Sequence, residues 1–239
     1  MRKFFGILLC LFAVLPLLGA SLTVYKALQN AQDRNSNDAF VPKAWHNLRS
    51  DEMFPDRLVH QAAGSDIQLW ARQGISKGTS CAEAFPAGYA DSVMADSCKL
   101  VLRATYIDPG GDMAATIGLV VANSPAQATE IESEINEDQS EGLRETRVPT
   151  VRPFAVSGTA VAGWSDDMAI GGASGSIFIP DSPYTVAVTV GPTDSARTVG
   201  QLPEPWDFLG YQEKYPYRDV AKTLADSYAR DLRKTVLGK

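Results

Sequence analysis

The two cysteines Cys81 and Cys98 are the residues whose chemistry depends most on where the protein resides. A zinc site would require further cysteine or histidine ligands at close spacing, and the only two histidines, His46 and His60, lie well upstream. The spacing of the pair also differs from the C-x-x-C arrangement of redox-active cysteines. Because bridges persist in an oxidising compartment, we predict a structural disulfide if this segment is exported. Two buried free thiols are the alternative.

A second stretch with chemical potential is GGASGS, which spans residues 171–176 and places a serine between glycines. A serine nucleophile at a sharp elbow requires the pattern G-x-S-x-G, whereas the segment that starts at Gly172 ends in Ser176. The base would have to be His46 or His60, and neither is accompanied by an oxyanion-hole motif. We predict a flexible glycine loop that enters a strand, or a loop that offers its backbone to a ligand. The candidate binding residues of this loop are Gly171, Gly172, Ser174 and Gly175.

Two tryptophans complete the set of candidate binding residues. Trp164 lies in GWSDD, beside Asp166 and Asp167. Carboxylates in a loop usually serve turns and caps, and stacking of a sugar on the tryptophan is the alternative. Trp206, in PEPWDF, either packs its loop onto the core or presents an aromatic side chain to a partner. The turn DPGGD, at 108–112, has only two carboxylates, too few for a dedicated calcium site. The sequence therefore predicts no catalytic residue, no cofactor and no metal site.

The N-terminus determines the expected compartment. The cations Arg2 and Lys3 precede an uncharged run of 22 residues, 4–25, which is long enough to cross a bilayer as a helix. Because positive charges favour the cytoplasmic side, we expect the N-terminus inside the cell and the rest of the chain outside. A cleaved signal peptide with a processing site around Ala20 is the alternative to a retained anchor.

This topology divides the chain into an anchor or signal sequence (1–25), a polar stalk (26–40) and an extracytoplasmic domain (41–239). A hydrophobic content of 45% is that of a globular protein, and about 200 residues suffice for one core. The formal net charge is −6, and it becomes −8 once the two N-terminal cations are set aside. Such an acidic domain argues against binding nucleic acid or anionic lipid headgroups through a basic face.

Alternating apolar and polar residues predict strands, and segments rich in glycine and proline predict the turns between them. The clearest pair of strands flanks DPGGD, where proline and glycine favour a tight turn. One or two short helices are expected between the two cysteines. The predicted strands are 66–75, 99–108, 113–122, 151–164, 174–180 and 184–191.

Two longer helices are expected. Ser124 and Gln127 flank a proline in an N-terminal capping pattern, and the helix that follows places an apolar stripe opposite carboxylates expected in solvent. The C-terminal helix, 217–239, repeats apolar residues every four positions from Val220 to Leu232. Helices that interrupt an antiparallel meander predict an α+β fold. We expect a single antiparallel sheet with helices packed on one face, preceded by an N-terminal transmembrane helix.

The order LRSDEMFP, a cysteine pair and then CKLVLRATYID with its hairpin resembles the uncharacterised membrane-anchored exported proteins of actinobacteria. The alternation of hairpins and helices is also similar in outline to the extracytoplasmic sensor-like domains of that phylum. These resemblances cover most of residues 40–190, and they imply an anchor and an exported domain with a cysteine pair. They supply neither catalytic residues nor a ligand.

The expected function is that of a non-enzymatic accessory or binding domain, tethered outside the cell membrane and acting through protein partners in the envelope. One alternative is an envelope hydrolase that uses the segment 171–176 or the pair Asp166 and Asp167. Another is a carrier of a small ligand or lipid, with a pocket between the sheet and the helices. A deep pocket with converging polar groups would favour the enzyme or the carrier, and an exposed apolar patch would favour partner binding.

Overall fold

The computed structural model describes residues 24–25, 28, 39–61, 66–87, 93–140, 150–177, 179, 181–194 and 211–237. The chain divides into two units, Met1–Lys43 and Ala44–Lys239. The predicted anchor and stalk lie almost wholly outside the described residues. Among the residues that are described, no helix has both the length and the apolar character needed to span a bilayer.

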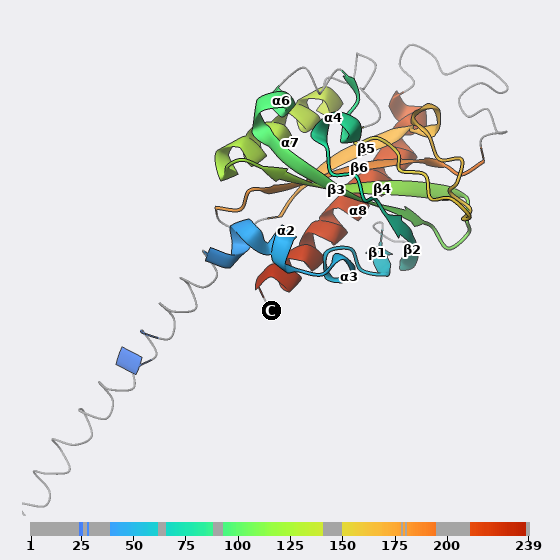
Figure 1. The fold of residues 1–239 in the computed structure, drawn as a ribbon. Coiled ribbons are helices and arrows are strands. Elements are labelled where there is room, and N and C mark those ends of the chain that lie inside the picture. The colour runs from blue at the N-terminus through green and yellow to red at the C-terminus, as the bar shows by residue number, and fades with distance from the viewer. Residues whose placement is uncertain are drawn as a thin grey trace, which may run out of the picture. The chain divides into compact units, whose positions relative to one another are not determined.

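The second unit is built on one antiparallel sheet of six strands, in the order β1-β2-β3-β4-β6-β5 (Figure 1). The prediction of an α+β fold with a single antiparallel sheet is therefore confirmed. The short strand β1 at one edge was not predicted. The strands are β1 (Arg57–His60), β2 (Gln68–Ile75), β3 (Cys98–Ile107), β4 (Met113–Ala122), β5 (Gly171–Ser176) and β6 (Tyr184–Pro192).

The described residues include two long helices and several short ones. The long helices are α7 (Pro125–Ser140) and α8 (Tyr211–Leu237), of which α8 begins six residues before the predicted helix and has Pro216 within it. The short helices are η1 (Val41–Lys43) in the first unit, and α2 (Ala44–Asn47), α3 (Ser50–Met53), α4 (Cys81–Ala84), α6 (Val93–Ser97) and η2 (Asp166–Met168) in the second. Two short helices are described between the cysteines, α4 and α6, which confirms the expectation of one or two.

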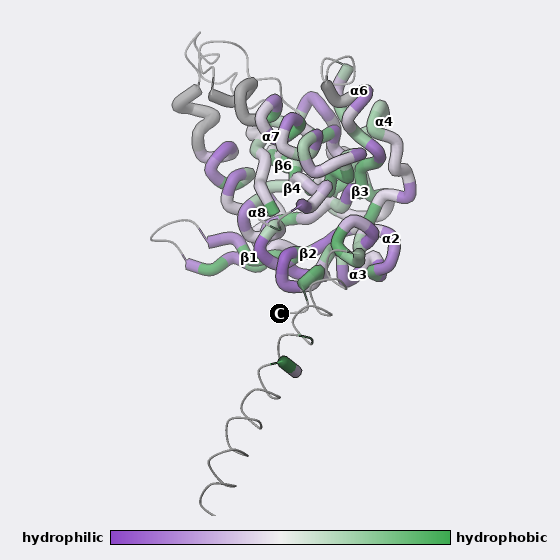
Figure 2. The backbone as a smooth tube through the Cα atoms, turned by 90° about the vertical axis from the view of Figure 1, so that its left-hand side faces the viewer, coloured by the Kyte–Doolittle hydropathy of each residue, from purple (hydrophilic) through white to green (hydrophobic). Residues whose placement is uncertain are grey.

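The hairpin β3–β4 forms as predicted from its turn residues. Asp108 accepts hydrogen bonds from the backbone N–H of Gly110 at 3.1 Å and of Met113 at 2.7 Å. Gly111 has a φ of 78°, a conformation that favours glycine because it has no Cβ. The first carboxylate of DPGGD thus stabilises the turn itself. Figure 2 colours the backbone by hydropathy and shows that hydrophilic residues recur along α8.

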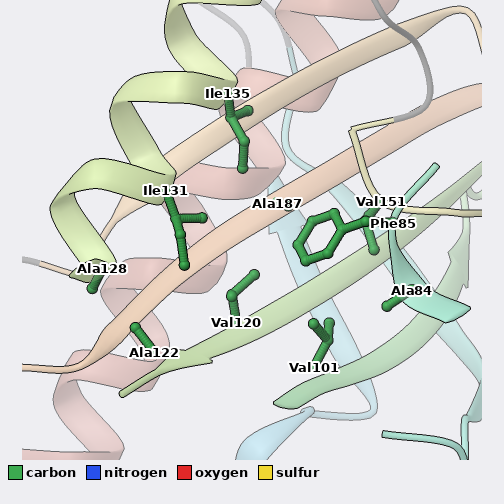
Figure 3. Close-up of a cluster of buried hydrophobic side chains, with 10 residues drawn as sticks. All are labelled: Ala84, Phe85, Val101, Val120, Ala122, Ala128, Ile131, Ile135, Val151 and Ala187. Atoms are coloured by element: carbon green, nitrogen blue, oxygen red, sulfur yellow. The ribbon is translucent and has the colours of Figure 1, made fainter. Parts of the chain in front are cut away.

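The helices pack on both faces of the sheet, so the expectation of one covered face is wrong. On one face, Ala187 of β6 and Val120 of β4 belong to a buried cluster with Ile131 and Ile135 of α7, which we call the α7-side cluster (Figure 3). On the other face, α8 lies so close to β5 that a Cβ on Gly175 would be 3.1 Å from the Ala225 carbonyl oxygen. The physical cause is the composition of the central strands, which are buried at nearly every position and therefore need cover on both sides.

The segment 151–164 is not the strand that its apolar alternation predicts. It crosses the face of the sheet that α7 also covers, and a row of paired threonines from β3, β4 and β6 binds its backbone. Thr116 accepts from the N–H of Phe154 at 3.0 Å, and Thr189 accepts from the N–H of Val151 at 3.1 Å. Thr105 donates to the Phe154 carbonyl at 2.6 Å. Side chains of the sheet thus satisfy backbone groups that would otherwise require a neighbouring strand.

The apolar stripe of α8 packs on the other face. Leu224, Tyr228 and Leu232 are buried as predicted, whereas Val220 is only partly buried. The ring of Tyr228 stacks on that of Phe54, with centroids 5.5 Å apart. This contact fixes the segment that precedes β1 against the helix.

Candidate functional site

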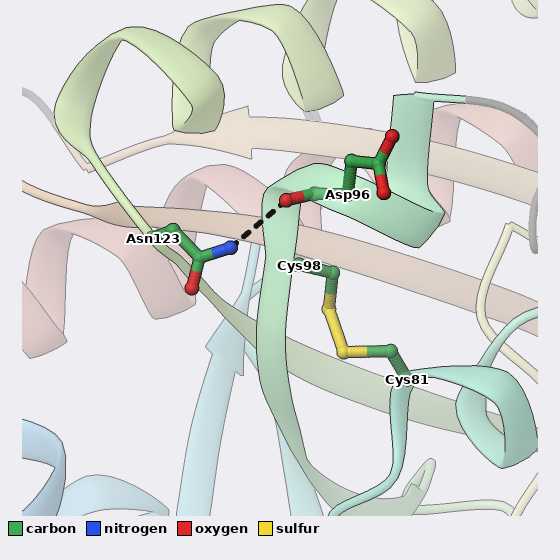
Figure 4. Close-up of a disulfide and its surroundings, with 4 residues drawn as sticks. All are labelled: Cys81, Asp96, Cys98 and Asn123. Carbon is green, nitrogen blue, oxygen red and sulfur yellow. Dashed lines mark hydrogen bonds between the residues drawn. A yellow bond between two sulfur atoms is a disulfide. The ribbon is translucent and has the colours of Figure 1, made fainter.

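The disulfide between Cys81 and Cys98 is present, as predicted for an exported segment. It joins the first residue of α4 to the first residue of β3, with Cα atoms 6.3 Å apart, and packs against the α7-side cluster. Next to it, the Asn123 side chain donates to the Asp96 carbonyl at 2.9 Å and so ties the residue that follows β4 to α6, the helix that leads into β3 (Figure 4). The bridge therefore has a structural place in the fold.

The glycine segment 171–176 is strand β5, an edge of the sheet, which begins three residues before the predicted strand 174–180. Its glycine-rich start is therefore part of the strand and not the flexible loop that was predicted to enter it. A Cβ on Gly171 would stand 2.4 Å from the backbone carbon of Tyr217 in α8. Glycine is therefore required for the close approach of helix and strand. Ser174 is 1% exposed and lies within the ladder to β6. The four candidate residues Gly171, Gly172, Ser174 and Gly175 thus form part of the core.

Serine chemistry with His60 as the base is incompatible with these positions. His60 lies on β1 and Ser174 on β5, and these are the two opposite edge strands of the sheet. Their side chains also point to opposite faces of the sheet. Ser174 is paired with Ala187, which belongs to the α7-side cluster. His60 lies two residues after Leu58 in β1, so both of these buried side chains point to the face that α8 covers.

The structure describes one of the two candidate tryptophans, Trp164. Trp164 is buried and donates from its indole N–H to Thr116 at 2.9 Å, so it packs the crossing segment onto the sheet. Trp206 lies outside the described residues. Of the neighbouring carboxylates, Asp166 pairs with Arg152 at 2.7 Å and Asp167 belongs to η2. Neither arrangement brings the aspartates into a common site with Ser174.

Among the described residues, a hollow lined by several charged side chains lies between α8 and the end of β5, and we call it the α8–β5 groove. It has a volume of about 450 Å³. Its residues are Ser176, Ile177, Lys222, Asp226, Ala229, Arg230 and Arg233. A smaller hollow of about 130 Å³ on the α7 side shares Ser176 and Ile177 with it and includes Glu132.

The α8–β5 groove has more positive than negative side chains. Lys222 pairs with Asp226 at 2.9 Å and also donates to the Ser174 carbonyl at 3.4 Å. The exposed cations Arg230 and Arg233 form no ion pair with any residue that the structure describes. The groove therefore offers two guanidinium groups that the described part of the fold does not use.

Glu132 adds a titratable carboxyl at the α7 end of this region. Burial raises the pKa of Glu132, and the nearby Asp226 acts in the same direction. The hydrogen bond with Ser176 and the charge of Lys222 oppose this rise in pKa without cancelling it. The carboxyl of Glu132 thus lies close to both charges of the Lys222–Asp226 pair of α8.

Sequence reasoning missed this groove, although a signal for it exists. Lys222, Asp226, Arg230 and Arg233 recur at intervals of four, four and three, which places them on one face of α8. The basic residues near the end of this helix are also favourable for its dipole, and that explanation is sufficient from the sequence alone. Only the placement of β5 beside this face shows that the side chains line a hollow.

His60, the last residue of β1, is a buried titratable group, 4% exposed, on a strand that α8 contacts. Its ring lies 6.3 Å from that of Trp70, and Gln68 pairs with it across the hairpin. Burial lowers the pKa of His60, while the charge of Asp219 acts in the opposite direction. Neither ring nitrogen has a hydrogen-bond partner among the described residues that would favour the charged form. The neutral imidazole is therefore the form that fits the folded state.

We expect acidification to destabilise the domain through His60. Because its pKa is lower in the folded than in the unfolded chain, the unfolded chain binds more protons. Stability is therefore fully present above about pH 6.5 and is lost as the pH falls through the folded pKa. The fall in melting temperature between pH 7.5 and 5.5 should be smaller in His60→Leu than in the native protein. The exposed His46 provides the control variant His46→Gln, and equal slopes in all three proteins would contradict this role of His60.

Neither a protein-family model nor a curated protein nor a solved structure matches the chain.

Proposed function

We propose that residues 26–239 form an exported, membrane-tethered binding domain that acts through partners in the cell envelope, with the α8–β5 groove as its binding surface. The uncharged N-terminal run after Arg2 and Lys3 supports a membrane tether. The disulfide supports export, because such bridges persist in oxidising compartments. The resemblance to exported actinobacterial proteins points to the same compartment.

The observation that carries this proposal is the pair Arg230 and Arg233 at the α8–β5 groove. Exposed arginines beside a hollow are suited to recognition, because guanidinium groups provide several directed hydrogen-bond donors. The fold makes no ion pair with them among the described residues. By contrast, Ser174, Trp164 and Asp166 all have structural partners, which favours a binding function over a hydrolase that uses them.

A carrier of a small ligand is the second candidate function. The volume of the groove, about 450 Å³, falls within the range of small-molecule sites, roughly 300–1,000 Å³. The two candidates share one surface and differ in what occupies it.

Site-specific photocrosslinking in intact membranes tests the binding surface. A photoreactive residue in place of Lys222, which is exposed and lines the groove, should give a discrete protein adduct, because this change leaves both arginines in place. The same residue in place of Lys77, which is exposed but outside the groove, is the matched control. The adduct should disappear when Arg230→Glu is added. The proposal would fail if both positions gave the same adducts, or if position 222 gave none.

A further inference from the structure

We infer that the α8–β5 groove is a binding site for a small organic anion, an inference that rests on the proposed role of this groove as the binding surface. The hollow is formed by one face of α8 and by Ser176 and Ile177 at the end of β5. The cations of the groove restrict the charge of the ligand, and the apolar surface of the groove restricts the rest of its structure.

The cations define the sign of the ligand. Lys222 is neutralised by Asp226 at 2.9 Å, which leaves the two guanidinium groups of Arg230 and Arg233 as net positive charge. Residues three apart on a helix are neighbours, with Cβ atoms about 5–6 Å apart, so both guanidinium groups can reach one anionic group. Guanidinium groups match the geometry of phosphate and carboxylate oxygens through paired N–H donors. A local positive site is also unusual in a chain of net charge −6.

The apolar surface of the groove defines the remainder of the ligand. Ile177 and Ala229 line the same hollow but are only 2% and 3% exposed, so the accessible apolar surface is mainly the methylene stems of the long cationic side chains. An inorganic ion would contact the guanidinium groups and leave these stems in contact with water. A ligand that joins an anionic group to an apolar body would cover the stems and gain from their burial.

Glu132 determines which side of the region the anion occupies. It lies with Ser176 in the adjoining smaller hollow, and a carboxyl there disfavours a second anion on the α7 side. The anionic group is therefore directed to the α8 side, towards Arg230 and Arg233. Asp226 has the same effect near Lys222, so the highest positive charge in the groove lies at Arg230 and Arg233.

Methyl NMR of the full chain in nanodiscs of zwitterionic lipid tests this site. Phenyl phosphate is the probe, and the methyl groups of Ile177 and Ala229 report on the groove. We expect saturable shifts of both signals, weaker binding of inorganic phosphate, and no shift with phenyltrimethylammonium. The methyl groups of Ile131, in the core between α7 and the sheet, should remain unchanged and so report that the fold is intact.

Charge reversal provides the decisive comparison. Arg230→Glu with Arg233→Glu should weaken phenyl phosphate binding by about tenfold or more, as expected for lost charge-assisted hydrogen bonds. Arg57→Glu with Lys77→Glu, which reverses two exposed cations outside the groove, should change the affinity by less than about twofold. Equal binding by both double variants, or equal shifts with phenyltrimethylammonium, would overturn the inference.

Further results of these experiments identify the source of the anion and distinguish a failure of this inference from a failure of the proposed function. Shifts of Ile177 and Ala229 in nanodiscs that contain anionic lipid, before any probe is added, would assign the anion to a lipid headgroup. A response to phenyl phosphate alone would assign it to a soluble molecule, and both results support an anion site. A groove that crosslinks to an envelope protein but does not bind phenyl phosphate would overturn this inference and leave the proposed function standing.

Discussion

Replacing Cys81 with serine is expected to lower the free energy of unfolding by about 3 kcal/mol, the chain-entropy value for a loop of this size. The bridge closes a loop between residues 17 positions apart and joins α4 to the start of β3. Its loss would release the segment that carries Phe85, a fully buried residue of the α7-side cluster. For a domain of this length, the melting temperature should fall by about 6–12 °C. Denaturant unfolding of the native and variant proteins measures both quantities.

The control for this experiment separates the bridge from the substitution. The double variant Cys81→Ser, Cys98→Ser should lose as much stability as the single variant, because neither can form the bridge. A reductant should destabilise the native protein towards the same value and leave the double variant unchanged. An unaltered melting temperature in the single variant would refute a structural role for the disulfide.

Gly171→Ala is expected to destabilise the domain by about 1–3 kcal/mol, the range for overpacking a close contact. The new Cβ would lie 2.4 Å from the backbone carbon and 2.5 Å from the carbonyl oxygen of Tyr217. Because these are backbone atoms of α8, no side-chain rotation relieves the clash, and helix and strand must separate. Chemical denaturation measures the loss, and limited proteolysis shows whether the start of α8 becomes accessible.

Gly163→Ala is the matched control for this second substitution. No neighbouring atom lies within 4 Å of a Cβ at Gly163, so its stability should stay close to that of the native protein. If Gly171 belonged to a loop that binds through its backbone, the alanine variant would fold normally and lose only binding. Native stability in Gly171→Ala would therefore contradict the packing role assigned to β5.

Features with a strong local signal could be predicted from the sequence. The hairpin β3–β4 follows from DPGGD, whose aspartate and glycine conform to the turn. The start of α7 follows from its cap, since Ser124 accepts from the N–H of Gln127 at 3.3 Å. The cysteine pair was predictable once export was assumed, because no other residues could provide a metal site with it.

Features that depend on distant neighbours could not be predicted. Segment 151–164 has the alternation of a strand, but threonines of the sheet bind its backbone in place of a strand partner. The glycines of β5 indicate a loop by composition, and only the closeness of α8 shows why a strand needs them. The near-continuous apolar run of 113–122 already indicated burial on both faces, and this signal was missed in favour of one covered face.

The same limit applies to the candidate site. Arg230 and Arg233 look like residues that favour the end of a helix, because the sequence does not show what lies beside them. Their place at a hollow results from the packing of α8 along β5, which joins residues about 50 positions apart. By contrast, Trp164 was selected for its residue type, and its buried hydrogen bond to Thr116 explains the tryptophan without a ligand.

Thiol labelling in intact cells that express the full chain tests the central claim of an exported, disulfide-bridged domain most directly. In a Cys10→Ser background, only Cys81 and Cys98 remain. A membrane-impermeant maleimide should label neither residue at first, and should label both in intact cells after treatment with an impermeant reductant. Labelling that requires permeabilised cells and no reductant would place both cysteines in the cytoplasm as free thiols, and would contradict the account.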